Sequence, residues 1–167
     1  WDVFVTPLED ANERVARAWG QVAHLHGVLD SPALRDAYNA NLPKLTRYWT
    51  ELGQDEQLFR RYRALRDSGA FADLSPARKR QVRNALRDFR LGGAELAPDR
   101  KTRFGAIQDE LAQLGAKFAE NVLDATNAYS IVIEDPARLT GLHEDLLAAA
   151  REAAQEDGCN GWKFTLH

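Results

Sequence analysis

The sequence of 167 residues contains no methionine and only one cysteine, Cys159. A single cysteine cannot form an internal disulfide, which excludes a disulfide-held fold and agrees with a reducing cytoplasm. Its setting, Asp-Gly-Cys-Asn-Gly, is typical of a turn and places no histidine or basic residue beside the thiol. An enzyme acting through Cys159 therefore has little support, and alkylating Cys159 without loss of a detected activity would exclude it. Because a newly made chain begins with methionine, we expect this one, from Trp1 to His167, to be part of a longer protein.

Long apolar runs are also missing, as is an excess of charge of either sign. No run approaches the roughly 20 apolar residues that a membrane-spanning helix needs. No basic segment followed by an apolar one, as in a signal peptide, opens the chain. The net charge is −3 and the isoelectric point is about 5.8, which gives no general attraction to nucleic acid or to an anionic membrane. We therefore expect a cytoplasmic protein with no nucleic-acid partner and no membrane partner.

Histidines are few, and their spacing does not suit a metal. A helical zinc motif needs histidines at positions i and i+4, so that both imidazoles leave one face of the helix. His143-Glu144 supplies the first half of such a motif, but the second position is Leu147. His24 and His26 are two residues apart and should point to different sides of a helix. His167 stands alone at the end of the chain.

Other catalytic patterns are absent as well. There is no Gly-x-Ser-x-Gly, and Gly92-Gly93 is not a phosphate loop because no strand precedes it and no Gly-Lys-Ser/Thr follows. Paired carboxylates such as Asp109-Glu110 are common on helix surfaces and do not indicate acid–base catalysis. We therefore assign no catalytic, no metal-binding and no cofactor-binding residue in this chain.

Helical periodicity covers the chain as far as Ala125. Thr6-Pro7-Leu8-Glu9 predicts a helix start with Thr6 as its cap and Glu9 completing a capping box. Two further starts combine a serine cap with proline, at Ser31-Pro32 and Ser75-Pro76, and Pro98 is expected to open the longest helix. Pro43 should kink or split the second helix, because proline removes a helical hydrogen bond. Gly92-Gly93 should end the helix that begins at Ser75-Pro76.

The pattern changes near the C-terminus. Residues 129–134 are rich in β-branched side chains and predict a strand, and Pro136 ends it. Residues 143–157 predict a short helix, and residues 162–167 predict a second strand that pairs with the first. The predicted fold class is mainly α: a multihelical, largely antiparallel bundle with a small β-hairpin near the C-terminus. We interpret residues 1–167 as a single helical domain, or a fragment of a larger protein.

A basic helical face is the one surface with a functional interpretation. Its arginines are spaced three or four residues apart, and a second group of arginines lies earlier in the chain. An anionic partner, such as RNA or the carboxylate of a peptide, would suit such a face. A solvated face, or one paired with acids such as Asp88, would show the same pattern. Aromatic residues do not alternate with the arginines as they do in many proteins that bind single-stranded nucleic acid. The face consists of Arg80, Arg83, Arg87 and Arg90, and the second group of Arg60, Arg61, Arg63 and Arg66.

Two blocks of sequence resemble the N-terminal helical region of the thimet oligopeptidase/neurolysin family of zinc metallopeptidases. They are Phe118-Ala-Glu-Asn-Val-Leu-Asp-Ala-Thr126 and Asn84-Ala-Leu-Arg-Asp-Phe89. Further matches follow in order along the chain, among them Ser31-Pro-Ala-Leu-Arg35, Tyr62-Arg-Ala-Leu-Arg66-Asp67 and Asp135-Pro136. No single block is as specific as a zinc motif, but their order and spacing extend the resemblance over nearly the whole chain.

The resemblance implies a neurolysin-like N-terminal domain of a large, mainly helical enzyme. Members have a deep channel that admits short, unfolded peptides, and they hold zinc with the two histidines of His-Glu-x-x-His and a later glutamate. The glutamate of the motif activates the water. None of these residues has a counterpart here, so the catalytic domain, with its one zinc ion, is expected outside this chain.

The expected role is therefore one wall of the channel, restricting substrate size, in a zinc metalloendopeptidase that hydrolyses short oligopeptides, including cleaved signal peptides. Its partner would be the catalytic domain of the same polypeptide, and the chain alone should be inactive. The alternative is a free-standing helical interaction module that binds a partner through the face of Arg80, Arg83, Arg87 and Arg90.

Overall fold

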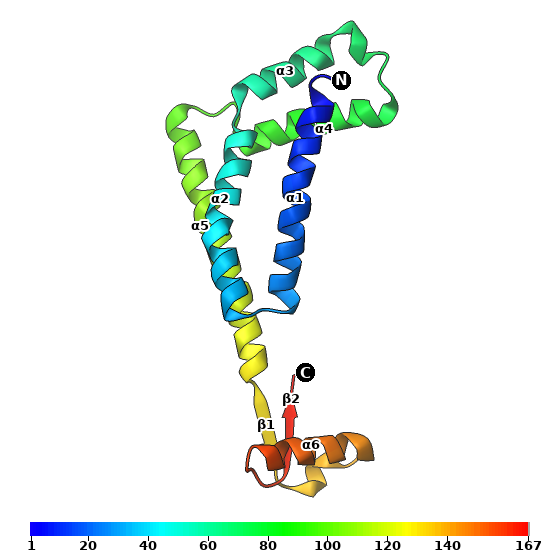
Figure 1. Cartoon of the computed structure of the whole chain (residues 1–167), viewed down its shortest axis with the longest axis vertical. Helices are drawn as coiled ribbons and strands as arrows, with labels where there is room; N and C mark the ends of the chain where they lie inside the picture. Colours follow the sequence, from blue (N-terminus) through cyan, green and yellow to red (C-terminus); the bar gives the residue numbers. More distant parts are fainter. Residues whose placement is uncertain (167) are drawn as a thin grey trace. The chain divides into compact units, whose positions relative to one another are not determined.

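A computed structural model describes residues 1–166, and the last residue of the expected second strand, His167, lies outside them. The described residues form six α-helices, two short 3-10 helices and one two-stranded sheet, so the mainly helical fold class with a small hairpin is confirmed (Figure 1). The helices are α1 (Val5–Val28), α2 (Pro32–Gly53), α3 (Glu56–Asp67), α4 (Pro76–Gly92), α5 (Pro98–Ala128) and α6 (Glu144–Glu156); the strands are β1 (Ser130–Ile133) and β2 (Trp162–Thr165).

The internal contacts of the chain fall into two compact units, Trp1–Ala116 and Lys117–His167. The first unit holds α1 to α4 and the first part of α5, and the second holds the rest of α5, the sheet and α6. The interpretation of residues 1–167 as a single domain or fragment stays a prediction. Each unit is described by itself below.

Side-chain caps fix two of the predicted helix starts. The Ser31 hydroxyl accepts a hydrogen bond from the backbone N–H of Leu34 at 3.3 Å, and the Ser75 hydroxyl accepts one from Arg78 at 3.3 Å. In both cases the following proline occupies the first helical position, where its missing N–H costs nothing. These contacts confirm the starts at Ser31-Pro32 and Ser75-Pro76.

The predicted cap at Thr6 is wrong. Helix α1 begins at Val5, and no side chain caps it. The backbone N–H groups of Val5 and Thr6 donate to the carbonyl of Trp1 at 2.8 and 3.2 Å, so a backbone turn at the start of the chain satisfies them. A capping residue must lie just outside the helix, and Thr6 is already inside its first turn.

Pro43 does not divide α2, which runs unbroken from Pro32 to Gly53. Side-chain donors bind carbonyls on both sides of the proline: Asn41 Nδ2 donates to the Ala37 carbonyl at 2.8 Å, and Thr46 Oγ1 donates to the Leu42 carbonyl at 3.0 Å. The packing of α2 against α1 and α4 accompanies this continuous helical path across the backbone donor that Pro43 lacks.

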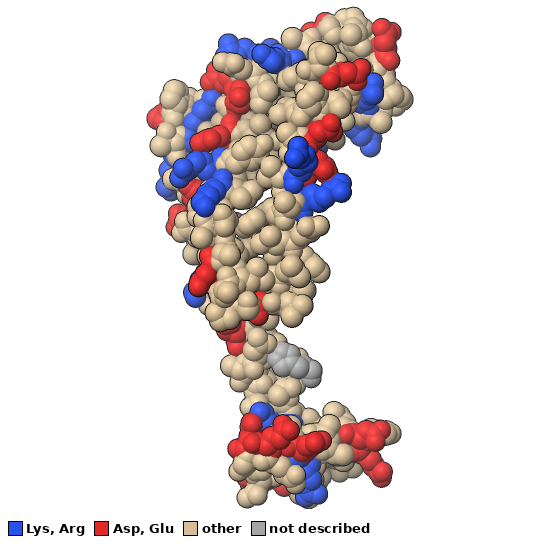
Figure 2. All heavy atoms as spheres, viewed as in Figure 1, with Lys and Arg blue, Asp and Glu red and all other residues tan. Residues whose placement is uncertain are grey.

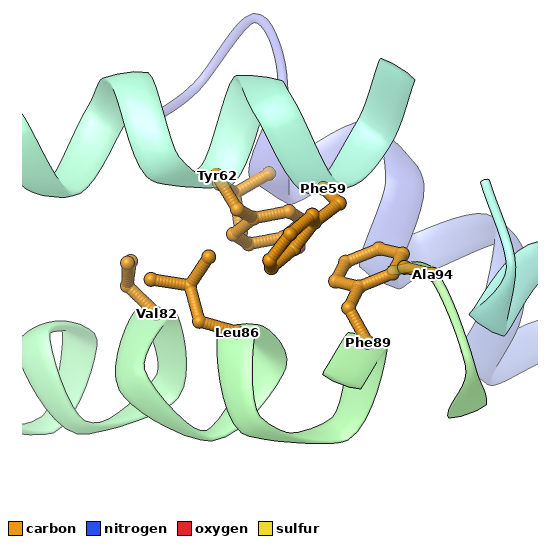
Figure 3. Close-up of a cluster of buried hydrophobic side chains, with 7 residues drawn as sticks. Phe59, Tyr62, Val82, Leu86, Phe89 and Ala94 are labelled. Atoms are coloured by element: carbon orange, nitrogen blue, oxygen red, sulfur yellow. The ribbon is translucent and has the colours of Figure 1, made fainter. Parts of the chain in front are cut away.

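The core of the first unit lies between the neighbouring helices α3 and α4 (Figure 3). Val82, Leu86 and Phe89 are spaced four and three residues apart, so they leave one face of α4 together. The Phe89 ring contacts the rings of Phe59 and Tyr62 from α3, with centroids 5.9 and 5.6 Å apart. Burying each such side chain stabilises the fold by about 1.5–3 kcal/mol, so these aromatic contacts set the position of α4 on α3.

Two adjacent glycines end α4 and let it approach α2. A Cβ atom at Gly92 would lie 3.0 Å from the carbonyl oxygen of Gly53 at the end of α2, so the two backbones meet where neither has a side chain. Gly93 has a φ of 95°, the left-handed conformation that commonly closes a helix. The prediction that Gly92-Gly93 ends this helix is confirmed.

The second unit is built on the predicted pairing of two strands. Strands β1 and β2 are antiparallel, with Ile131 opposite Phe164 and Ile133 opposite Trp162. Helix α6 lies between them in the sequence and packs against β2. The Arg151 guanidinium of α6 lies 4.9 Å from the centre of the Trp162 ring, a cation–π contact that joins helix to strand.

Candidate functional site

The predicted arginine face lies on α4, and all four of its arginines are exposed. Arg83, Arg87 and Arg90 line a shallow hollow of about 360 Å³, and Arg66 of α3 completes it. Arg80 does not line this hollow. The sequence did not predict that Arg66 joins the arginines of α4, because only the packing of α3 beside α4 brings these residues together.

Acidic neighbours offset most of this positive charge. Arg66 Nε donates to Asp67 at 2.7 Å, Arg87 pairs with Asp88 at 2.8 Å, and Arg90 Nε lies 3.5 Å from Glu95. On the side of the molecule seen in Figure 2, basic and acidic residues are interspersed rather than gathered into one basic patch.

The remaining two arginines of the face differ from these. The Arg83 guanidinium lies 5.8 Å from the centre of the Phe71 ring, and Arg80 forms no ion pair or ring contact within residues 1–166. Arg80 and Arg83 are therefore the members of the face with charge to offer an anion.

The Arg66–Asp67 pair also shifts the ionisation of both groups. The hydrogen bond from Arg66 holds the pKa of the Asp67 carboxyl below its usual value, and the same bond raises the pKa of Arg66. Both residues stay charged near neutral pH, so Arg66 contributes a compensated rather than a free cation to the hollow.

The other early arginines have structural contacts. Arg60 lies 3.6 Å from Glu56, Arg61 lies over the Phe4 ring at 5.9 Å, and Arg63 lies over the Phe59 ring at 5.7 Å. The guanidinium groups of Arg61 and Arg63 thus lie over aromatic rings in and beside the core, and Arg60 pairs with an acid of its own helix. The second group of arginines does not form a separate binding face.

The histidines have different surroundings and separate positions. His26 is buried, stacks on Tyr38 with ring centroids 4.1 Å apart, and has its Nε2 atom 3.9 Å from Asp30. His24 is exposed, as expected for a residue on another side of α1. The Nδ1 atom of His143 accepts a hydrogen bond from the backbone N–H of Asp145, so this histidine caps α6.

Residues 1–166 bring together no group of three His, Cys, Asp or Glu side chains that could hold a metal ion. The donor set therefore does not fit the zinc of the family that the sequence resembles. Cys159 is exposed, and its thiol lies 3.8 Å from the Asp157 carbonyl. Among the helices of the described residues, none is both long and apolar enough to cross a membrane.

A second hollow, not foreseen from the sequence, lies among α1, α2, α3 and α4. We call it the acidic pocket; its volume is about 410 Å³, and Glu9, Asn12, Trp49, Tyr62 and Asp88 are among its lining residues. Glu9 accepts a hydrogen bond from the Tyr62 hydroxyl at 3.1 Å. Burial, followed by the negative charge of Glu9, raises the pKa of Tyr62, so this hydroxyl stays a neutral donor.

No sequence motif could have revealed the acidic pocket. Its two carboxylates are separated by 79 positions, from Glu9 to Asp88, and Trp49 comes from a third helix. The hollow forms because the end of α2 packs between α1 and α4. Only the tertiary packing of these helices brings its members together.

Comparison with known proteins gives a consistent assignment. The model of the neurolysin/thimet oligopeptidase N-terminal domain family matches residues 1–101. The chain is 43% identical to oligopeptidase A of Haemophilus influenzae and 40% identical to oligopeptidase A of Escherichia coli, in both cases over 99% of this chain and 24% of the relative. It is 28% identical to a dipeptidyl carboxypeptidase of Escherichia coli over 97% of the chain.

The chain thus spans about a quarter of the length of these relatives. The matching model covers more than half of the chain, and it describes the N-terminal domain of its family. The identity to the oligopeptidase A proteins continues beyond residue 101 and includes nearly all of the second unit. This chain therefore belongs to the neurolysin/thimet oligopeptidase family, in which it corresponds to the N-terminal region of oligopeptidase A.

Proposed function

We propose that this chain is the N-terminal, channel-wall part of a zinc metalloendopeptidase that hydrolyses short oligopeptides, including cleaved signal peptides. The observation that carries the proposal is the 43% identity to an oligopeptidase A over 99% of this chain but only 24% of that protein. A catalytic domain of the same polypeptide would be the partner, short peptides the substrates and the cytoplasm the location. The lone, exposed Cys159 is compatible with a reducing compartment.

The proposed role of this chain is to bind and exclude, not to react. Residues 1–166 offer no donor set for zinc, so its ligands and the general base would belong to the catalytic domain. Zinc supplies a Lewis acid that polarises the scissile carbonyl and lowers the pKa of a bound water. The contribution of this chain would be a rigid wall, which the buried aromatic contacts between α3 and α4 support.

An apolar face on α5 supports a partner domain. Ile107, Leu111 and Leu114 recur four and three residues apart along the part of α5 in the first unit, and their side chains are 38%, 57% and 59% exposed. Exposed apolar stripes of this kind are typical of surfaces that another domain or chain covers. We expect the chain by itself to self-associate through such surfaces, and sedimentation of the isolated chain as a clean monomer would contradict this expectation.

The experiment that tests the proposed function compares this chain with the full polypeptide encoded by its gene. With a fluorogenic short peptide and added zinc, the full polypeptide should turn over substrate, and a chelator should abolish the turnover. The purified 167-residue chain should show none under the same conditions. Zinc-dependent turnover by the chain alone would contradict its non-catalytic role, and an inactive full polypeptide would contradict the peptidase assignment.

The hollow beside Arg83 favours one second candidate, a free-standing interaction module that binds an anionic partner through Arg80, Arg83, Arg87 and Arg90. A peptide with a free C-terminal carboxylate should then bind more tightly than its amidated form. Arg83→Ala should remove that difference, while Arg151→Ala, which changes an arginine of the second unit, should not. Equal binding of both peptides would exclude carboxylate recognition by this face.

A further inference from the structure

Within residues 1–166, the lining of the acidic pocket contains carboxylates but no basic side chain. None of the described residues that line it is lysine or arginine, although the chain contains 22 such residues. Two carboxylates, of Glu9 and Asp88, belong to its lining. Its volume of about 410 Å³ is within the range of roughly 300–1,000 Å³ that is usual for small-molecule sites.

The two carboxylates are not equivalent. Asp88 is already paired with Arg87 at 2.8 Å, and its side chain is 59% exposed. Within residues 1–166, Glu9 has one hydrogen-bond partner, the neutral hydroxyl of Tyr62, and forms no ion pair. One oxygen of Glu9 is thus fixed by Tyr62, while its negative charge stays uncompensated. The orientation of Glu9 is therefore set before any ligand arrives, which reduces the cost of binding.

Trp49 supplies an aromatic surface to the same pocket. Five rings in the described residues carry an arginine over their face: Trp1, Phe4, Phe59, Phe71 and Trp162. Trp49 is not among them. It is 37% exposed, and its one aromatic contact within residues 1–166 is the edge-on ring of Tyr48, with centroids 4.9 Å apart. Tryptophan is the aromatic residue that attracts cations most strongly.

We propose that the acidic pocket binds an alkylammonium group, as carried by the side chain of a peptide lysine. The ammonium would form a charge-assisted hydrogen bond with Glu9, and its alkyl chain would lie along the Trp49 ring and the apolar residues Leu8 and Leu52 of the lining. The inference goes beyond the proposed function, because it concerns binding by this chain and requires no catalytic domain. Failure of either proposal therefore leaves the other intact.

The test is a titration of the 167-residue chain with N-acetyl-lysine-N-methylamide, followed through the indole N–H signal of Trp49 in NMR spectra. We expect a saturable shift and a dissociation constant in the millimolar range or tighter, and no saturable shift with the uncharged norleucine analogue. Free butylamine separates the two sources of the cation: binding as tight as that of the lysine derivative would assign the site to simple amines and overturn the peptide part of the proposal.

Single substitutions test which side chains form the binding site. Glu9→Gln keeps an acceptor for Tyr62 and removes the charge, so affinity should fall at least about tenfold, as for the loss of a charge-assisted hydrogen bond. The matched control is Asp10→Asn, which changes the net charge equally at an exposed neighbour that does not line the pocket, and it should bind as the parent does. Trp49→Phe, a smaller ring, should weaken binding by a smaller factor; because this variant lacks the Trp49 indole, its titration is followed through the backbone N–H signal of Asn12, another residue of the lining. Unchanged affinity in Glu9→Gln, equal losses in both carboxylate variants, or no saturable shift in the parent would overturn the proposal.

Discussion

At the scale of single residues, Lys101 joins three helices. Its ammonium donates to the Glu56 carboxylate at 2.6 Å and to the Gln54 carbonyl at 3.4 Å, which links the start of α5 to the start of α3 and the end of α2. The side chain of Gln54 returns a hydrogen bond to the Lys101 carbonyl at 3.3 Å. These contacts secure the point where three helix ends meet.

The Lys101–Glu56 contact predicts a pH effect with a defined sign. The hydrogen bond and charge of Lys101 hold the pKa of Glu56 below its ordinary value of 4.5. A carboxyl whose folded pKa is depressed stabilises the fold above its unfolded pKa, and this contribution disappears as pH falls through the folded value. Lys101→Gln should raise the pKa of Glu56 toward its ordinary value, as measured by NMR titration of its side-chain carboxyl. A Glu56 pKa unchanged by the substitution would contradict the assigned cause.

Tyr62 predicts a stability effect at the same scale. Tyr62→Phe removes the hydrogen bond to Glu9 from a residue that is only 1% exposed, and should lower the free energy of unfolding by about 1 kcal/mol. The matched control is Tyr48→Phe, which removes a 2.7 Å hydrogen bond to Asn12 from a residue that is 37% exposed. Water replaces the lost partner at Tyr48, so the fall in the free energy of unfolding, measured by urea denaturation, should be smaller. A larger cost at Tyr48 would refute the role assigned to burial.

At the scale of helices, the crossing of α2 and α4 depends on missing side chains. The Gly53 and Gly92 backbones approach so closely that a Cβ at Gly92 would lie 3.0–3.2 Å from three backbone atoms of Gly53. Backbone atoms cannot rotate away as a flexible side chain can. Spacing patterns in the sequence locate the two helices, but they do not show that these two glycines meet.

This crossing predicts opposite signs for two glycine-to-alanine substitutions. Gly92→Ala should destabilise the chain by about 1–3 kcal/mol, because the added methyl group forces the helices apart. Gly20→Ala lies within α1, where an added Cβ meets nothing within 4 Å, and should stabilise by about 0.5–1 kcal/mol through its higher helix propensity. Thermal unfolding of both variants measures the difference, and stabilisation by Gly92→Ala would show that the close approach is not rigid.

At the scale of the whole molecule, residues 1–166 bury few large side chains. The buried hydrophobic cluster of the first unit consists of Val5, Phe59, Tyr62, Val82, Leu86, Phe89 and Ala94. Large apolar residues of α5 are exposed in the same unit. This distribution agrees with a chain that spans about a quarter of the length of its relatives, in which other segments are proposed to cover the exposed faces.

Leu114 predicts how the isolated chain and the full polypeptide differ. Its side chain is 59% exposed here, so Leu114→Ser should change the unfolding free energy of the 167-residue chain by less than about 0.5 kcal/mol. In the full polypeptide the same substitution should cost about 2 kcal/mol or more if another segment buries Leu114. The matched control in both settings is Gln113→Ser, which places the same residue at an exposed neighbouring position of α5. Equal, small effects of Leu114→Ser in both proteins would show that this part of α5 stays exposed.

The sequence by itself determined the elements of this protein. Proline and serine caps mark helix starts at Ser31 and Ser75, glycines end α4, and β-branched residues mark β1, because each signal acts through backbone geometry within a few residues. Thr6 shows the limit of such signals: the helix begins at Val5, where the Trp1 carbonyl accepts the first backbone N–H groups, so Thr6 already lies inside the first turn.

Only the tertiary structure determined which side chains from distant parts of the chain share a surface or a pocket. Packing of α3 beside α4 brought Arg66 to Arg83, Arg87 and Arg90, and acids adjacent to these arginines offset most of the charge. Packing of α1, α2 and α4 joined Glu9, Trp49 and Asp88 in one pocket. Such groupings depend on contacts between residues far apart in the chain, for which the local spacing of side chains carries no information.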